Sequence, residues 1–405
     1  MKRIPLALAA ICSVPAWAAD SASFNPDTSL ILQGRYLTAK DIEERQISGF
    51  LPAGLHDHGS GRGFSLDHTE LTFSSNVDHA FRAYANFAIA DEVVEVEEAW
   101  FQTLALDHGF TVKGGRFLSG IGYSNEHHPH AWDFADQSLM GKVLFGAHLI
   151  QDGVQAKWLA PTATFLEFGV EAARGQNFPG SEAGADKNGA GSWSAFTHIG
   201  NDLGDSHSWR TGIAYLHAAP QERESHLEDV NEVEALSLFS GDSKTWIADF
   251  VWKWAPDGNS RERNFKLQAE YFQRTESGDL TCEDNSIDEL GNPTGGACDG
   301  TIGTYEAKQS GYYAQVVYQF IPRWRAGYRY DWLDSGDVTF GANAGMLEPT
   351  DYHPTRHSMM VDYSPSEFSR LRLQLAQDKS MQEVTDNQVT LQYVMSIGPH
   401  GAHKF

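Results

Sequence analysis

The chain has 405 residues, of which 41% are hydrophobic and 21% charged, and its mean hydropathy is −0.40. Thirty basic residues against 54 acidic residues give a formal net charge of −24 at pH 7. This surplus of acid argues against nucleic-acid binding, which needs a basic face.

The first twenty residues, MKRIPLALAAICSVPAWAAD, have the layout of a secretory signal: a basic start, an apolar run and then small residues. We expect cleavage near Ala18 or Ala19, so that residues 1–19 are a signal peptide and residues 20–405 the mature chain. The mature chain has no second apolar run of membrane-helix length. An exported chain of this kind is either soluble or a β-barrel, the only other backbone that spans lipid.

Runs in which apolar and polar residues alternate recur along the whole mature chain, and this period of two predicts β-strands. In PRWRAGYRYDWLD, residues 322–334, the tryptophans and tyrosines fall on one face and the arginines on the other. Lipid on the aromatic face and water on the arginine face account for this division. We count sixteen strands, with eighteen as the alternative. In three runs both alternating sets of residues include apolar side chains, so the pattern does not show which set faces lipid. These runs are residues 64–77, 93–106 and 110–117.

The predicted connections between strands alternate between short turns and long loops. The long loops are residues 38–63, 118–152, 175–190, 219–243, 275–309 and 335–355. Short periplasmic turns and long extracellular loops are typical of outer-membrane barrels. We therefore predict an all-β fold: one transmembrane antiparallel β-barrel, residues 20–405, in the bacterial outer membrane.

Two cysteines remain after removal of Cys12 with the signal peptide. Cys282 and Cys298 lie in one polar, acidic stretch. In an oxidising exported compartment the two are expected to form a disulfide, because a metal site would need further ligands close by.

Basic residues outnumber acidic ones on the face that this register turns toward the lumen. The predicted pore-lining residues are Arg35, Arg82, Arg210, Lys266, Arg323, Arg325, Arg329, Arg370 and Arg372. Such a strip would attract anions or set a transverse field across a pore. The alternative is that these side chains pair with carboxylates of the lumen and stiffen the wall.

The long loops are acidic. Residues 219–243 hold seven carboxylates against one arginine, Arg223. At a surface covered with lipopolysaccharide, such loops would draw or hold divalent cations. The alternative is that they only stay solvated.

Histidines gather in the third long loop, in the stretch GYSNEHHPHAWDFAD. The candidate metal ligands there are Glu126, His127, His128 and His130. Imidazole and carboxylate are ligands of zinc, but Pro129 keeps His128 extended, so one ion would hardly bind all three histidines. The alternative is that this loop packs inside the barrel or narrows it.

Two motifs carry a family resemblance: HPHAWDFADQ, residues 128–137, and GPHGAHKF, residues 398–405. They are similar to a group of proteobacterial porin-like outer-membrane proteins, often labelled zinc-regulated outer-membrane receptors. The resemblance implies entry of zinc or another small solute. The terminal Phe405 also resembles the signal that the barrel assembly machinery reads.

Some members of that group are described as TonB-dependent, which requires a plug domain ahead of about 22 strands. Only residues 20–28 precede the first predicted strand, so a channel is favoured over an energised receptor. We predict a porin that passes small hydrophilic solutes or ions passively, requires no cofactor and, like many porins of this size, forms a homotrimer. A surface-binding receptor or adhesin with a blocked lumen is the alternative. No motif places Ser, His and an acid together, so an enzyme is not expected.

Overall fold

The computed structural model describes residues 26–398, except residues 43–44, 52–60, 91–92 and 147. The predicted signal peptide and Phe405 lie outside the described residues. The strands are β1 (Asp27–Thr38), β2 (Gly63–Ser65), β3 (Thr69–Asn76), β4 (Phe81–Ala90), β5 (Val93–Thr103), β6 (Phe110–Leu118), β7 (Ile150–Leu159), β8 (Phe165–Ala173), β9 (Ser192–Leu203), β10 (His207–Ala218), β11 (Arg223–Glu228), β12 (Glu234–Trp254), β13 (Asn264–Cys282), β14 (Ile302–Ile321), β15 (Trp324–Thr339), β16 (Thr355–Ser366), β17 (Ser369–Lys379) and β18 (Asp386–Ile397). The helices are η1 (Ser124–Glu126), η2 (Pro129–Ala131), α1 (Leu139–Phe145), α2 (Glu182–Ala185), η3 (Pro256–Gly258) and η4 (Gly341–Asn343). No described helix combines the length and apolar character needed to cross a membrane.

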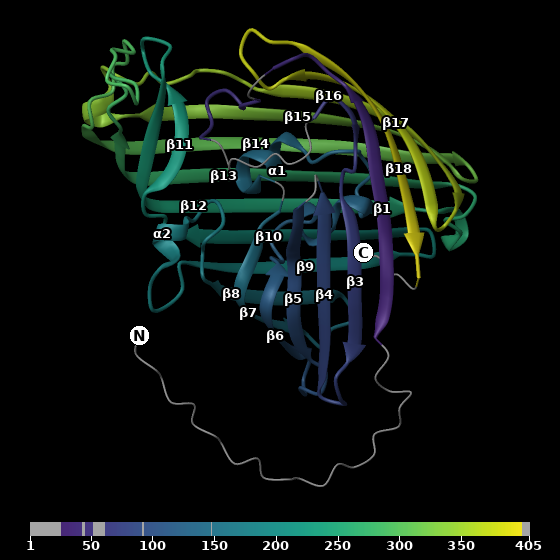
Figure 1. Ribbon diagram of the computed structural model, residues 1–405. Helices are drawn as coiled ribbons and strands as arrows, with labels where there is room; N and C mark the ends of the chain where they lie inside the picture. Colours follow the sequence, from purple (N-terminus) through teal and green to yellow (C-terminus); the bar gives the residue numbers. More distant parts are fainter. Residues whose placement is uncertain (1–25, 43–44, 52–60, 91–92, 147, 399–405) are drawn as a thin grey trace, which may run out of the picture.

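The strands close into one antiparallel barrel (Figure 1). The sheet holds 18 strands, of which β2 and β11 are short additions that pair along β1 and β12, leaving sixteen in the ring. Strand β1 closes the ring by pairing with both β18 and β3. The predicted fold class and the favoured strand number are confirmed.

Apolar side chains alternate with buried polar ones around the barrel wall. On β17, Leu371, Leu373 and Leu375 are 46–49% exposed on the outside, whereas Arg372 and Gln374 between them are 1% exposed on the inside. The neighbouring strand β18 repeats the pattern. An apolar outer face of this extent is stable where hydrocarbon covers it, and this places the wall in a membrane.

Aromatic side chains pack at both ends of this apolar belt. Near the short turns, Trp324 packs against Tyr363 with ring centroids 4.8 Å apart. Toward the long loops, Tyr215 packs against Trp246 at 4.8 Å. Tyrosine and tryptophan favour the interface between lipid and water, so these pairs mark the two edges of the bilayer.

Strands β12, β13 and β14 continue well past the apolar belt. They have 21, 19 and 20 residues, about twice the 9–11 that cross a bilayer. On the outer face of β14 the aromatic residues end at Tyr312, and Lys308, Glu306 and Thr304 follow in the same register. The strands therefore leave the lipid there and enter water.

This extension corrects the predicted loops at residues 219–243 and 275–309, which are in large part strand. The sequence pattern did not indicate it, because beyond the bilayer the outer face meets water and needs no apolar residues. The inner face instead carries an apolar cluster that includes Phe239, Leu280 and Tyr305.

The predicted disulfide is present in this extension. Cys282 and Cys298 are bonded, with Cα atoms 5.4 Å apart, and both are buried in the same apolar cluster.

Replacing both cysteines with serine is expected to free the enclosed loop while the barrel stays folded. The bond closes a loop with a sequence separation of 16, and a crosslink of this span stabilises by up to about 3 kcal/mol. Limited proteolysis should then cut between the two positions in the double variant and leave the wild type uncut. Equal cleavage of both proteins would contradict this.

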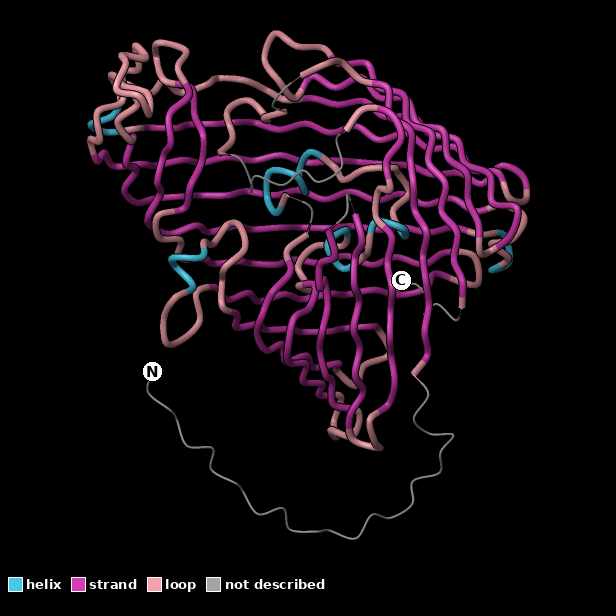
Figure 2. Tube along the Cα trace, in the orientation of Figure 1, coloured by secondary structure: helices cyan, strands magenta, loops and turns pink. Residues whose placement is uncertain are grey.

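The connection between β6 and β7 folds into the lumen instead of projecting outward. We call residues 119–146 and 148 the inserted segment; it carries η1, η2 and α1, which Figure 2 shows inside the ring of strands. Side chains of α1 such as Leu139 and Leu144 pack against Phe196, Phe272 and Leu333 of the wall. The loop predicted at 118–152 thus forms part of the barrel core.

Candidate functional site in the lumen

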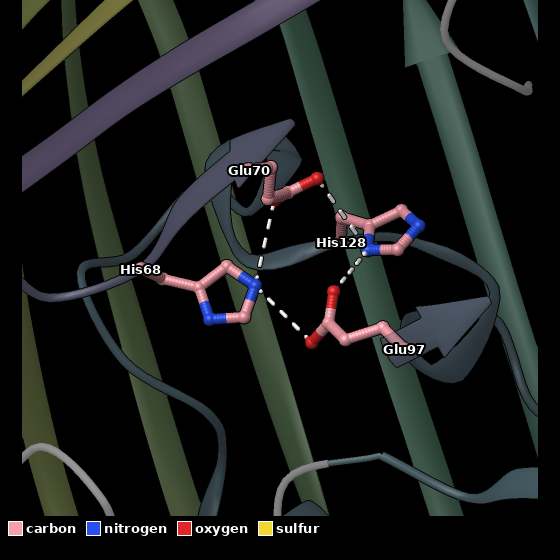
Figure 3. Close-up of side chains that lie close together, drawn as sticks. All are labelled: His68, Glu70, Glu97 and His128. Carbon is pink, nitrogen blue, oxygen red and sulfur yellow. Dashed lines mark ion pairs between the residues drawn. The ribbon is translucent and has the colours of Figure 1, made fainter. Parts of the chain in front are cut away.

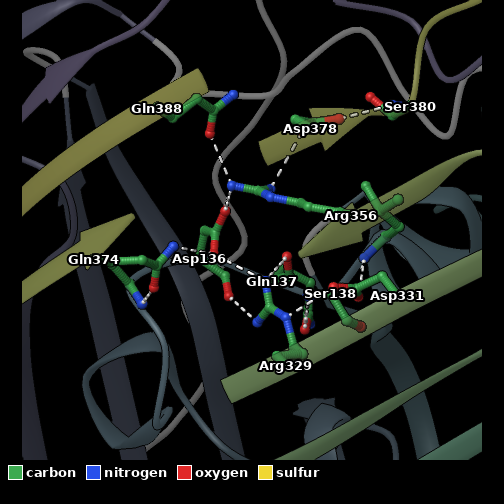
Figure 4. A network of polar contacts seen from close by, with 12 residues as sticks. Asp136, Gln137, Ser138, Arg329, Asp331, Arg356, Gln374, Asp378, Ser380 and Gln388 are labelled. Carbon is green, nitrogen blue, oxygen red and sulfur yellow. Dashed lines mark hydrogen bonds and ion pairs between the residues drawn. The ribbon is translucent and has the colours of Figure 1, made fainter. Parts of the chain in front are cut away.

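Two aspartates fix the inserted segment to the basic side of the wall. Asp136 contacts Arg329 at 2.9 Å and Arg356 at 2.5 Å (Figure 4). Asp133 contacts Lys266 at 3.0 Å and Arg325 at 3.1 Å. These four cations belong to β13, β15 and β16, so the segment bridges strands that are distant in sequence.

Charge keeps both aspartates ionised. Burial alone would raise the pKa of Asp136, but Arg356 and Arg329 outweigh burial and hold that pKa well below its ordinary value. Burial likewise opposes ionisation of Asp133, and Lys266 and Arg325 lower its pKa in the same way. The two ionic anchors therefore persist well into the acidic range.

Backbone groups of the inserted segment are also bound by the wall. The guanidinium of Arg370 donates to the His130 carbonyl at 2.7 Å, and that of Arg372 donates to the Trp132 carbonyl at 3.1 Å. On a different part of the ring, Glu270 accepts from the Ser124 amide at 2.8 Å. Since these partners lie on β13 and β17, the segment is held from several sides.

Most of the predicted pore-lining residues contact the inserted segment or another acid. Six do so with the segment: Arg210, Lys266, Arg325, Arg329, Arg370 and Arg372. Arg35 lies inside and pairs with Asp67 at 3.3 Å. These residues therefore do not form a strip of free basic charge.

Two members of the predicted set lie elsewhere. Arg323 is exposed in the turn between β14 and β15 with a φ of 74°, so its prediction as a strand residue facing the lumen is wrong. A tight turn needs a residue in the left-handed region, and this breaks the alternation at that point. Arg82 is exposed near the short turn before β4 and approaches Ser74 at 3.4 Å.

The predicted metal ligands do not converge on one point. Glu126 pairs with Arg210 at 2.8 Å, and His127 approaches the Tyr123 carbonyl at 2.8 Å. Only His128 belongs to a compact cluster of four possible ligands, and His130 lies at its edge. The extended backbone at His128 separates the neighbouring side chains, as Pro129 led us to expect.

The cluster combines the inserted segment with the opposite wall, as Figure 3 shows. Its members are His68, Glu70, Glu97 and His128. His68 precedes β3, Glu70 lies in β3, Glu97 lies in β5 and His128 comes from the inserted segment. The sequence pattern singled out only His128 among these four.

A β-bulge explains why Glu97 was missed. Asn86 on β4 pairs with Glu98, but the next residue, Phe87, pairs with Val96, so Glu97 is an extra residue in β5. Both Glu97 and Glu98 are consequently buried, each 7% exposed. The signal in the sequence was the acidic pair Glu97 and Glu98 within a spanning strand, since carboxylates in the middle of a strand avoid lipid.

Further contacts orient the cluster. His128 Nε2 lies 3.0 Å from Glu98, and Glu70 interacts with His130 at 2.7 Å and accepts from the Asn86 amide at 2.8 Å. Burial would lower the pKa of His128, but Glu70, Glu97 and Glu98 together raise it well above its ordinary value. For nearby His148, burial outweighs the charge of Glu97 and lowers the pKa to about 4.

Cavities lie on both sides of the inserted segment. Toward the long loops there is a cavity of about 240 Å³ bordered by Arg45, Trp132 and Asp136. Toward the short turns there are cavities of about 880 Å³, bordered by Asp133 and Lys253, and about 520 Å³. The segment thus separates an outer from an inner polar space within the lumen.

No family model matches this chain. An uncharacterized protein of Aquifex aeolicus (strain VF5) is 31% identical over 407 residues, which cover 95% of this chain and 80% of that protein. The zinc-related role implied by the two sequence motifs stays a prediction.

Solved structures similar in fold are outer-membrane barrels. The outer membrane channel DcaP of Acinetobacter baumannii has a TM-score of 0.53 at 13% identity, covering 93% of this chain and 99% of that chain. The anion-selective porin from Comamonas acidovorans has 0.53 at 10%, with 92% and 99% covered. OmpT of Vibrio cholerae in a trimer form has 0.52 at 11%, with 92% and 99% covered. The architecture is therefore that of outer-membrane porins.

Proposed function

This chain belongs to the family of the Aquifex aeolicus protein and has the porin fold, and we propose that it is a passive channel for small hydrophilic solutes or ions. The observation that carries the proposal is the pair of polar spaces on either side of the inserted segment. Cavities with polar lining on both sides of a segment that crosses the lumen suit diffusion limited by size and charge.

Acidic residues at the outer mouth support a further part of the proposal, that divalent cations such as zinc are among the solutes. Arg223, the one arginine in residues 219–243, is buried against Glu276 at 2.8 Å. Exposed carboxylates of the same stretch, such as Glu222 and Glu224, are therefore not neutralised by it. Negative charge at a mouth raises the local concentration of cations.

Purified protein in a planar lipid bilayer is expected to show stepwise openings. Each step reports one channel, because solutes cross only through the lumen. A salt gradient across the same membrane should give a reversal potential that favours cations, given the acidic mouth. Silent membranes would contradict the channel and favour the alternative of a surface-binding receptor or adhesin.

The other roles and partners that the sequence predicts for this chain are proposals as well. A porin fold supports a channel without enzymatic activity, and a passive channel needs no TonB-type energy coupling. The trimer form of the similar OmpT structure supports a homotrimer for this chain. Contact with lipopolysaccharide through the acidic loops, and recognition of Phe405 by the barrel assembly machinery, remain predictions.

A further inference from the structure

The histidine and glutamate cluster brings one possible ligand atom from each of four residues within 4.8 Å of one another. His68 Nε2 lies 3.2 Å from Glu97 and 3.5 Å from Glu70, and His128 Nδ1 lies 3.3 Å from Glu97 and 3.7 Å from Glu70. Two ligands of a tetrahedral zinc ion, each about 2.0–2.1 Å from the metal, lie about 3.3 Å apart. These nitrogen–oxygen separations are close to that edge length, but each glutamate reaches the two histidines with different oxygens. A bound ion would therefore draw the four ligand atoms closer together.

The contacts within the cluster are poor hydrogen bonds. Glu97 Oε2 and His68 Nε2 are buried and make no hydrogen bond, although both point into the cluster. Glu97 Oε2 does lie within ion-pair distance of His128 Nδ1, but without hydrogen-bond alignment. A buried carboxylate oxygen without a donor is costly, and a cation at the centre would satisfy it.

The cluster also lacks a permanent positive charge. Among the residues that the structure describes, Glu70 and Glu97 form ion pairs with histidines alone. Buried carboxylates require a compensating cation. A metal ion at this point would supply two positive charges at any pH, whereas a histidine supplies one only while it is protonated.

The orientation of His128 suits a ligand. Its Nε2 faces Glu98 at 3.0 Å, which leaves Nδ1 directed at Glu70 and Glu97. A carboxylate on the far nitrogen of a histidine is the usual support for a metal-binding imidazole. Asn86 and His130 hold Glu70 in the same manner.

We propose that a divalent transition-metal cation of the zinc class binds to His68, Glu70, Glu97 and His128 and fastens the inserted segment to the wall. Two imidazole nitrogens with two carboxylates favour zinc over calcium or magnesium, which prefer oxygen ligands alone. The ion is a resident one that bridges β3, β5 and the segment. This inference does not depend on metal ions being transported.

Calorimetric titration of Zn²⁺ into the chelator-treated full chain in detergent tests the site. Wild type is expected to bind one ion per chain, and His128→Ala to bind it at least about tenfold more weakly. Glu97→Gln, which keeps the size of the side chain, should weaken binding similarly and serves if His128→Ala does not fold. His226→Ala is the matched control, because His226 pairs with Glu234 on the outer hairpin.

A second measurement, cleavage by trypsin, tests whether the ion holds the inserted segment to the barrel wall. Zn²⁺ is expected to protect the inserted segment of the wild type from trypsin, and to give no protection to Glu97→Gln. Three results together support the site: one Zn²⁺ bound per wild-type chain, weaker binding by the variants, and protection from trypsin in the wild type alone. Absence of stoichiometric binding in wild type, or equal binding by wild type and Glu97→Gln, would overturn it and leave a network of protonated histidines and carboxylates. Neither measurement uses conductance, so failure here is distinct from failure of the channel.

Discussion

Replacing Asp136 with asparagine is expected to release the inserted segment and to increase conductance. The substitution leaves Arg329 and Arg356 without their shared carboxylate inside the lumen. Breaking a buried ion pair on one side costs about 3–5 kcal/mol when the remaining charge is left uncompensated. Arg329 and Arg356 keep contacts with Asp331 and Asp378, so we expect the lower end, about 3 kcal/mol, which raises the released population by a factor of about 100. Single-channel recordings should show frequent transitions to a larger conductance.

Asp299→Asn is the matched control, since it makes the same chemical change on an exposed carboxylate of the outer loop. It should behave as wild type. Trypsin cleavage after Lys142 gives an independent measure and should rise in Asp136→Asn alone. If conductance and cleavage of Asp136→Asn both equal those of wild type, Asp136 does not anchor the segment.

The Asp136 anchor should also resist acid. The pKa of Asp136 in the folded protein lies below its ordinary value. At any pH above the ordinary pKa, Asp136 contributes its full stabilisation, and this stabilisation is lost only when the pH falls through the lowered pKa. The difference in conductance between wild type and Asp136→Asn should therefore be the same at about pH 8 and at about pH 5. A difference that vanishes by pH 5 would contradict the ionic anchor.

Placing a charge on the outer face of β17 is expected to destabilise the barrel strongly. Leu373 is 46% exposed near the middle of this 11-residue strand, where the apolar belt faces lipid. Arginine at the midplane of a barrel wall costs about 2–4 kcal/mol. Leu373→Arg should lower the free energy of unfolding in lipid bilayers by that amount, measured by denaturant titration with tryptophan fluorescence.

Leu290→Arg provides the comparison, because Leu290 is 87% exposed on an outer loop. The same substitution there moves a charge into water and should leave the free energy of unfolding unchanged. Equal effects of the two substitutions would mean that Leu373 does not face hydrocarbon.

Part of the metal-ligand cluster was visible in the sequence and part was not. His128 stands in a conspicuous histidine stretch, whereas His68, Glu70 and Glu97 lie in runs whose facing was ambiguous. The bulge at Glu97 changes which residues face inward, and a period of two carries no information about such a change. Similarly, the pairing of Arg329 with Asp136 joins positions 193 residues apart.

Alternation and loop lengths were enough to predict the barrel, sixteen strands as the favoured number, and the end at which the long loops lie. Lipid outside and water inside impose an alternation on every spanning strand, and that alternation is local. The position of the inserted segment in the lumen, the cations that hold it and the contacts between histidines and glutamates became apparent only from the folded chain. Those contacts form across a closed ring, between residues that no short stretch of sequence brings together.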